Sequence, residues 1–183
     1  LNNDTLVLPG TLDRVVSFLD DHSEVAGVGG NLLNPDGSFQ SGYTKFPSLW
    51  EEFLMATKLG LLIRPYYPSQ PPASEVKAVD WMSTAFMLFR REALEDVNLV
   101  DEAYFIYCDE TDLQYRLKEK GWQIYYLPDV ETIHFGGKSL NPWKRRQMVY
   151  RGYLLFFTKN YSTLSTLLLR VIFAGVSAAK LPY

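Results

Sequence analysis

The sequence predicts an α/β domain, and three observations support this fold class. Short apolar runs typical of strands alternate with segments of helical periodicity from residue 11 to residue 135. Proline and glycine are scattered between these segments, which disfavours a coiled coil. The 183 residues are 47% hydrophobic and 21% charged, an ordinary globular composition that suffices for one domain with its own core.

The first half of the chain is expected to hold a helix, a strand, a turn and a second helix. Residues 11–22 have apolar side chains at helical spacing, with Thr11 placed to cap them. Val25 to Gly30 are typical of a short buried strand, and Asn-Pro-Asp-Gly at 34–37 indicates a turn. Residues 48–63 predict another helix. A loop follows at 65–74, which contains four prolines.

The second half predicts further alternation. Residues 79–89 indicate a mostly buried strand that is interrupted near Ser83 and Thr84. A short helix is expected at 92–97 and a longer one at 109–121, where Asp112 and Arg116 form an i,i+4 pair. Two strands, 122–127 and 130–135, are expected on either side of Pro128-Asp129.

The character of the chain changes near residue 140, so we expect one segment at 1–140 and another at 141–183. The second begins with a basic and aromatic helix and continues with an apolar run at 164–179. This run would be ~24 Å long as a helix, short of a ~30 Å hydrocarbon core. An interfacial membrane helix is the favoured interpretation. A span that continues past the sequence and an amphipathic helix packed on the domain are the alternatives.

Composition excludes several classes of function. The net charge of −3 provides no global attraction to nucleic acid. A single cysteine excludes a disulfide framework and is compatible with a reducing compartment. Only two histidines, His22 and His134, are present, so a histidine-rich metal site is excluded.

Two segments carry carboxylates suited to chemistry. Asn2-Asn3-Asp4 offers oxygen ligands of the kind that Mg²⁺ or Mn²⁺ prefers, although such a triplet also makes turns and helix caps. The acidic segment 109–112 begins a predicted helix, where the helix dipole favours carboxylates. Crowded carboxylates also raise the pKa of one member, which would suit a general base.

Two further segments are suited to substrate contact. The sequence His-Phe-Gly-Gly-Lys-Ser at 134–139 ends a strand, and its glycines allow close approach of a ligand. Lys138 and Ser139 are suited to phosphate oxygens. Small and polar residues interrupt the strand at 79–85, either beneath a substrate or as a bulge at a sheet edge.

Taken in order, five segments resemble glycosyltransferase family 2, most closely its rhamnosyltransferase-like branch, which builds bacterial surface polysaccharides. They are LNNDT, LLNPDGS, VDWMSTAFMLFRREAL, YCDETDLQYRLKEKGW and IHFGGKS. The resemblance runs from Leu1 to about Lys159 and implies part of a GT-A fold, a Rossmann-like α/β sandwich. It also implies inverting transfer of a sugar, such as rhamnose or another hexose, from a nucleotide-diphosphate donor to a saccharide or lipid-linked acceptor in cell-surface polysaccharide synthesis.

The resemblance also implies roles for individual residues. Asn2 and Asp4 fall at the Asp-x-Asp-type motif that binds Mg²⁺ or Mn²⁺, and His134 matches a histidine that completes the metal site. The acidic pair is inverted to Asp109-Glu110 in this chain, so Glu110 is the first choice for the catalytic base and Asp109 the second. The remaining implied assignments are Lys138 and Ser139 to the donor diphosphate, and Asp80, Trp81, Ser83, Thr84, Tyr107 and Asp112 to the acceptor.

The chain departs from the family pattern in other places. Thr84 stands where glycine is common, and Gln114, Arg116 and Trp122 match the Gln-x-x-Arg-Trp motif of processive relatives only loosely. In the family, a β-α-β half that holds the nucleotide base precedes the metal motif. We therefore expect these 183 residues on their own to be poorly active.

Two other functions remain open at this point. One is a catalytically inactive carbohydrate- or protein-binding remnant, and the other is a nucleotidyltransferase, which the lack of a glycine-rich phosphate loop disfavours. We expect a bacterial or archaeal protein on the cytoplasmic face of the membrane. Its basic cluster would bind anionic headgroups, and no nucleic-acid partner is expected. The cluster consists of Lys144, Arg145, Arg146 and Arg151.

Overall fold

The computed structural model describes residues 1–63, 67–136 and 141–179, which group into two compact units. The sheet unit comprises Leu1–Phe46, Ser69–Asp101 and Glu110–Lys138. The helical unit comprises Pro47–Pro68, Glu102–Asp109 and Ser139–Tyr183. The segment 141–183 expected from the sequence therefore lies in the helical unit, together with two earlier stretches of the chain.

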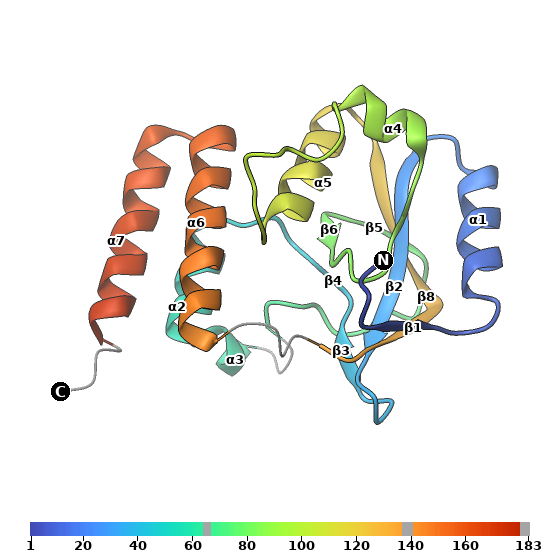
Figure 1. The fold of residues 1–183 in the computed structure, drawn as a ribbon, viewed down its shortest axis with the longest axis horizontal. Helices are drawn as coiled ribbons and strands as arrows, with labels where there is room; N and C mark the ends of the chain where they lie inside the picture. The colour runs from blue at the N-terminus through green and yellow to red at the C-terminus, as the bar shows by residue number, and fades with distance from the viewer. Residues whose placement is uncertain (64–66, 137–140, 180–183) are drawn as a thin grey trace. The chain divides into compact units, whose positions relative to one another are not determined.

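A mixed sheet forms the centre of the sheet unit, in agreement with the predicted α/β class and consistent with part of a GT-A fold. Strands β2 and β8 are parallel neighbours, and the other strands pair with them antiparallel (Figure 1). The path through the sheet is β1-β8-β2-β3, with β5 on β8 and β7 on β2. The strands are β1 (Thr5–Val7), β2 (Val25–Leu33), β3 (Phe39–Ser41), β5 (Lys77–Val79), β7 (Leu88–Phe89) and β8 (Gln123–His134).

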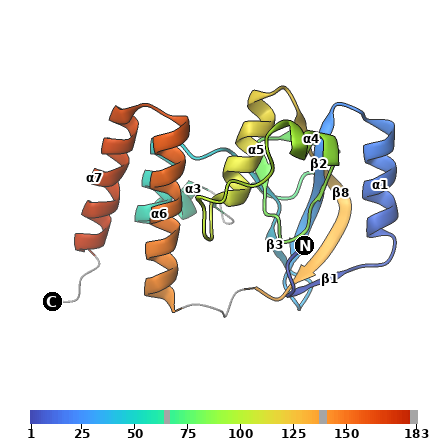
Figure 2. The same ribbon diagram turned by 45° about the horizontal axis from the view of Figure 1, so that its top comes forward.

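Helices cover both faces of this sheet. Helix α1 (Thr11–Asp21) buries Val15 and Leu19 against one face. Helix α5 (Asp109–Glu119) buries Leu113 and Leu117 against the other, near the short helix α4 (Arg91–Asp96) (Figure 2). Strand β2 is buried along almost its whole length because it is covered on both sides.

Two local expectations in the sheet unit were wrong. Residues 123–134 form one strand rather than two, because the ladder passes Pro128 through an irregularity opposite Gly30. A Cβ on Gly30 would lie 2.0 Å from the main-chain oxygen of Val130, so only glycine fits there. Helix α1 is capped by Gly10 in a left-handed conformation, while the hydroxyl of Thr11 donates to the main-chain oxygen of Glu131 (3.4 Å).

The predicted interruption near Ser83 and Thr84 is confirmed. Strand β6 (Trp81–Met82) leaves the main sheet and pairs with β4 (Tyr43–Thr44) in a separate ribbon. The chain turns at 83–87 before it rejoins the main sheet as β7.

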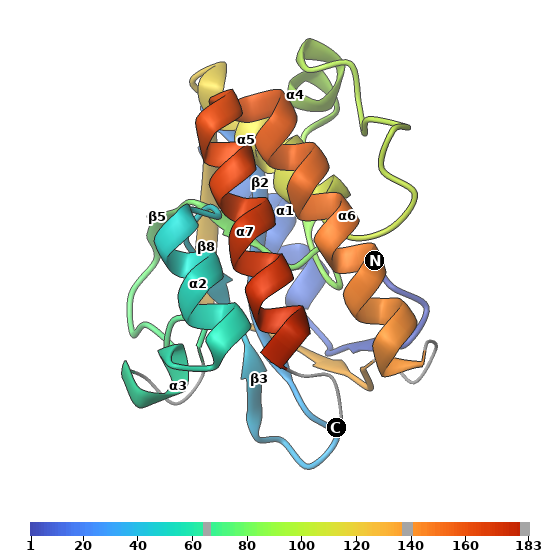
Figure 3. The same cartoon turned by 90° about the vertical axis from the view of Figure 1, so that its left-hand side faces the viewer.

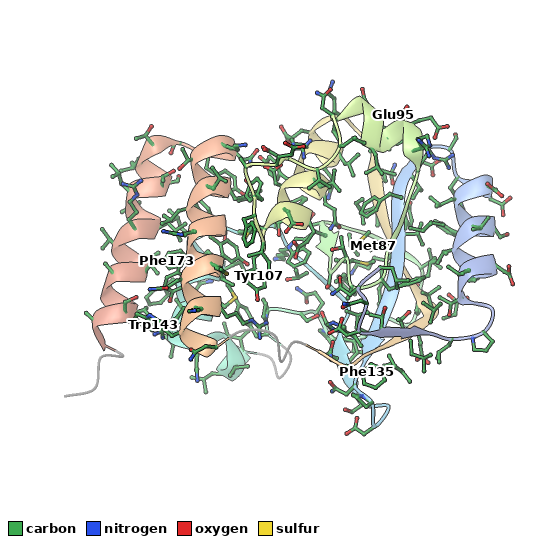
Figure 4. The ribbon with its side chains drawn as sticks, viewed as in Figure 1. Met87, Glu95, Tyr107, Phe135, Trp143 and Phe173 are labelled. Atoms are coloured by element: carbon green, nitrogen blue, oxygen red, sulfur yellow. The ribbon has the colours of Figure 1, made fainter. Side chains whose placement is uncertain are left out.

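The helical unit contains α2 (Leu49–Thr57), α3 (Gly60–Ile63), α6 (Pro142–Asn160) and α7 (Thr163–Ala179). The helix predicted over 48–63 is interrupted at Lys58, which has φ = 64°. Helix α7 packs against both α2 and α6 (Figure 3). Tyr150 of α6 and Phe173 of α7 stack with their ring centroids 3.9 Å apart. Phe173 is labelled in Figure 4.

Helix α7 has a buried face and an exposed apolar face. Leu169 and Phe173 are buried. Among the residues that the structure describes, none of the helices combines the length and the apolar character needed to cross a bilayer. The exposed apolar face consists of Leu164, Leu167, Leu168 and Val171, at i, i+3, i+4 and i+7.

Candidate active site

Asp4 and His134, two of the predicted metal ligands, are brought together by the pairing of β1 with β8. Thr5 is the register partner of His134, and the main-chain N–H of Phe135 donates to the main-chain oxygen of Asp4 (2.9 Å). Oδ1 of Asp4 consequently lies 3.4 Å from Nε2 of His134. Both side chains are only partly exposed.

Gln40 on β3 determines which ring nitrogen of a neutral His134 carries the proton. The Gln40 amide nitrogen donates to Oδ1 of Asn34 and to the main-chain oxygen of His134, both at 2.9 Å. The amide oxygen of Gln40 therefore faces Nδ1 of His134, at 2.7 Å. An amide oxygen only accepts, so Nδ1 carries the proton.

With the proton on Nδ1, Nε2 of a neutral His134 is the nitrogen available to Asp4 or to a cation. In a neutral imidazole with a proton on Nδ1, Nε2 presents a lone pair, and here it is directed at the Asp4 carboxylate. Two lone-pair atoms face one another favourably only with a positive charge between them. A proton on Nε2 would supply that charge, and so would a cation bound by both side chains. The donor set and the partner that orients the histidine fit a divalent metal ion.

The pair does not form a complete metal cage. Within residues 1–63, 67–136 and 141–179, no group of three or more His, Cys, Asp or Glu side chains is arranged to hold a metal. Asn2, the third predicted ligand, is exposed. Its main-chain N–H donates to Ala85, and its main-chain oxygen accepts from the Thr5 hydroxyl. Mg²⁺ commonly uses one or two protein carboxylates and takes its other ligands from water and substrate phosphates, so two side chains are compatible with such a site.

The acidic pair Asp109-Glu110 begins α5, directly after a strained turn. Tyr107 and Cys108 have φ values of 64° and 65°, a left-handed conformation that is rare for residues other than glycine. Each such residue costs roughly 1–2 kcal/mol, so tight packing must hold the turn in place.

Gly152 of α6 provides that packing inside the helical unit. A Cβ at Gly152 would lie 2.8 Å from the main-chain oxygen of Tyr107 and 3.0 Å from Sγ of Cys108. The Arg145 guanidinium lies 5.9 Å from the centroid of the Tyr107 ring. Tyr107, a predicted acceptor contact, is thus held by α6 close to the start of α5.

Gln114 anchors α5 to the ribbon of predicted acceptor residues. Its side chain is fully buried and makes two hydrogen bonds to Met82, accepting from the N–H (2.9 Å) and donating to the oxygen (2.8 Å). It also donates to the main-chain oxygen of Glu110 (3.2 Å). The first turn of α5 is therefore fixed to β6.

Several predicted acceptor residues lie on or beside this ribbon. Asp80 accepts a hydrogen bond from Lys118 (2.7 Å), and the Trp81 indole donates to the main-chain oxygen of Lys45 (2.9 Å). The Ser83 hydroxyl accepts from the N–H of Ala85 (3.3 Å), and Thr84 lies in the same half-buried turn. Their role toward an acceptor stays a prediction.

Asp112 is placed differently from the other acceptor candidates. Its side chain is buried, and its carboxylate accepts from Nε of Arg116 (2.7 Å), which confirms the predicted i,i+4 pair. Arg116 in turn donates to the main-chain oxygens of Val97 and Leu99. These contacts tie α5 to the end of α4. The predicted diphosphate contacts Lys138 and Ser139 lie outside the described residues.

Sequence reasoning missed Gln40 and Gly152 as residues that organise the site, and it named Gln114 only for a loose motif match, without its contacts to Met82. Gln40 is an ordinary polar residue in a short strand, and no local pattern relates it to His134. Gln114 had a local signal, since a polar residue lies between Leu113 and Leu117 on the buried side of an amphipathic helix. Gly152 also had one, because glycine is unfavourable in a helix interior and indicates a close approach.

Comparisons with known proteins identify relatives of this chain. The sequence profile of the family described as "Glycosyltransferase like family 2" matches residues 1–153. The N-acetylglucosaminyl-diphospho-decaprenol L-rhamnosyltransferase of Mycobacterium tuberculosis is 28% identical over 140 residues, which cover 72% of this chain and 44% of that protein. Rhamnosyltransferase WbbL of Escherichia coli K12 is 35% identical over 91 residues, which cover 50% of this chain and 33% of WbbL. The chain thus spans less than half the length of either relative.

Proposed function

Since the chain belongs to glycosyltransferase family 2, we propose that the protein transfers a sugar, with rhamnose as the first candidate, from a nucleotide-diphosphate donor to a saccharide or lipid-linked acceptor. The similarity to two rhamnosyltransferases supports the choice of sugar. The observation that carries the proposal is the Asp4–His134 pair, which Gln40 orients as a donor set for a divalent cation.

The residues of this chain have separate tasks in the proposed reaction. Asp4 and His134 would hold Mg²⁺ or Mn²⁺, which when bound neutralises charge on the leaving diphosphate. Gln40, which accepts the hydrogen bond from Nδ1, would leave Nε2 of the neutral histidine as the ligand atom. Glu110, or Asp109 beside it, would accept the proton of the acceptor hydroxyl as that oxygen attacks the sugar from the side opposite the leaving group, which inverts the anomeric centre.

Two conservative variants of the full-length protein test this proposal and choose between the carboxylates. We expect the base variant, Glu110→Gln, to lower kcat by roughly 10²–10⁴-fold while the Kd of the nucleotide-sugar donor changes little. Asp109→Asn, the matched neighbour, should reduce kcat far less. The opposite ranking would make Asp109 the base. Turnover that survives both variants, or equal loss of donor binding, would contradict the proposal. A wild-type protein that binds sugar without turnover would support the inactive remnant.

We further propose that the helical unit rests on the cytoplasmic surface of a membrane. Two features support this: residues 142–160 contain no acidic side chain, and α7 exposes an apolar face. In a vesicle flotation assay with anionic lipids, Leu167→Ser with Val171→Ser on the exposed face should reduce binding severalfold. The equally exposed Leu12→Ser of α1 is the control. Unchanged flotation would refute membrane docking through α7.

A further inference from the structure

The helical unit contains a cavity of about 300 Å³ between the loop 103–107 and helix α6. All of its lining residues belong to this unit, and Tyr107 is visible beside α6 in Figure 4. We propose that this cavity, the loop–α6 pocket, holds the lipid end of the acceptor: the first part of a polyprenyl chain together with its diphosphate. This inference rests on the proposed transfer to a lipid-linked acceptor and locates the lipid. The lining residues are Ala103, Tyr104, Phe105, Ile106, Tyr107, Met148, Arg151, Gly152 and Leu155.

The wall of the pocket is suited to an apolar chain. Helix α6 contributes Met148, Arg151, Gly152 and Leu155, at i, i+3, i+4 and i+7, so they share one face of the helix. The loop contributes aromatic and branched side chains opposite this face. Phe105 is 90% exposed and Ile106 beside it is 38% exposed, so neighbouring apolar side chains of the pocket are open to a ligand.

The basic side chains around the pocket favour an amphiphile with an anionic head. Arg151 lines the pocket, and Arg145 lies over the ring of Tyr107. Helix α6 carries no acidic residue from Pro142 to Asn160 but five basic ones, so its field attracts anions. An apolar wall beside a cationic rim is complementary to a prenyl chain with a phosphorylated head and less so to a neutral glycan.

Size and position support the same occupant. Ligand pockets commonly span ~300–1,000 Å³, so this one takes part of a long lipid and not the whole chain. Its loop wall continues through Tyr107 and Cys108 directly into Asp109, which belongs to the same unit. A lipid diphosphate held by Arg151 would therefore place the attached sugar near Asp109.

Binding of farnesyl diphosphate to the full-length protein, measured by calorimetry without any nucleotide sugar, tests the pocket. We expect Phe105→Ser and Arg151→Glu each to weaken binding by roughly tenfold, because they remove apolar cover and reverse the charge at the rim. Both side chains are solvent-exposed, so folding should tolerate the changes. The matched controls are Leu12→Ser and Arg91→Glu in the sheet unit, which are exposed and far from the pocket in sequence; binding should stay within about twofold of wild type.

Each alternative outcome would overturn the proposal. Equal binding by the variants and wild type would refute the pocket. Binding of inorganic diphosphate as tight as that of farnesyl diphosphate would reduce it to an anion site. If the variants lose vesicle binding but bind farnesyl diphosphate as tightly as wild type, these side chains contact the membrane surface and not the lipid diphosphate. Donor binding, measured on the same proteins, separates this result from the proposed function: if wild type binds donor but no prenyl diphosphate, sugar transfer stands and the pocket fails.

Discussion

The Gln40 amide oxygen lies 2.7 Å from Nδ1 of His134, and this contact determines which imidazole nitrogen faces Asp4. Asn34 extends the chain of contacts, because its own amide donates to the Ser38 hydroxyl (3.0 Å) and so fixes the direction of Gln40. The turn at 34–38 thereby positions His134, a predicted metal ligand nearly a hundred residues further along the sequence. Replacing such hydrogen-bond partners of metal-binding histidines commonly weakens metal affinity by about 10–100-fold.

Replacing Gln40 should weaken metal binding without unfolding the protein. Gln40→Leu removes the acceptor for Nδ1, so the proton is free to move to Nε2 and block the ligand atom. We expect the Kd for Mn²⁺, measured by electron paramagnetic resonance with a nucleoside diphosphate present, to rise about 10–100-fold. Gln40→Glu, which keeps an acceptor oxygen, should restore most of the affinity. Gln123→Leu at the far end of β8 serves as the control. Equal Kd values for Gln40→Leu and wild type would exclude a positioning role.

Enlarging Gly152 should disturb the turn that leads into the acidic pair. An added methyl meets a main-chain oxygen at 2.8 Å, so the contact cannot be relieved by a side-chain rotation. We expect Gly152→Ala to lower the free energy of unfolding in urea by about 1–3 kcal/mol. Gly175→Ala in α7 is a matched control, since a Cβ there meets nothing within 4 Å. It should raise stability by roughly 0.5–1 kcal/mol. The same sign for both variants would contradict the close contact.

Glu52 should make the helical unit less stable as the pH rises. The side chain is 2% exposed, and its Oε2 has no hydrogen-bond partner in the part of the chain that the structure describes. Burial, and to a lesser degree the carboxylate of Glu51, raises the pKa of Glu52 from 4.5 to about 8. The folded protein therefore binds more protons than the unfolded chain between these values. The stability that the neutral Glu52 carboxyl contributes is fully present below pH 4.5 and is lost progressively up to about pH 8.

Glu52→Gln removes this proton-linked loss. Urea unfolding at pH 8 should show a gain of roughly 2–4 kcal/mol relative to wild type, with little difference at pH 4.5. The exposed Glu102→Gln in the same unit provides the comparison and should leave the pH profile unaltered. A wild-type unfolding free energy that does not fall across this pH range would show that Glu52 is not buried as described.

Replacing Gln114 should lower the free energy of unfolding more than replacing an exposed glutamine. Gln114→Leu would remove both hydrogen bonds that the Gln114 amide makes to the buried main chain of Met82, at a cost of about 1–3 kcal/mol for each group. We expect a loss of roughly 2–4 kcal/mol in the free energy of unfolding. The exposed Gln147→Leu on α6 should change it by less than about 0.5 kcal/mol. Similar losses for the two variants would argue against the anchoring of α5 to β6.

Periodicity and turn chemistry predicted most of the secondary structure, because these signals are local. The helix at α1, the turn at 34–37, the interrupted strand near Ser83 and the long helix α5 all appear where the sequence indicated them. The passage of β8 through Pro128 could not be predicted locally. A proline normally ends a strand, and only the fit of Gly30 against Val130 allows the ladder to resume.

The sequence by itself determined the fold class, the family pattern and the identity of the chemical groups, since these depend on residue type and order. Tertiary structure alone decided how the groups are arranged. The register of β1 on β8 brings Asp4 to His134, and Gln40 selects the nitrogen that faces it. Gly152 allows α6 to press on the turn before Asp109. These relationships join residues far apart in the chain, where no local periodicity or spacing carries information about distance.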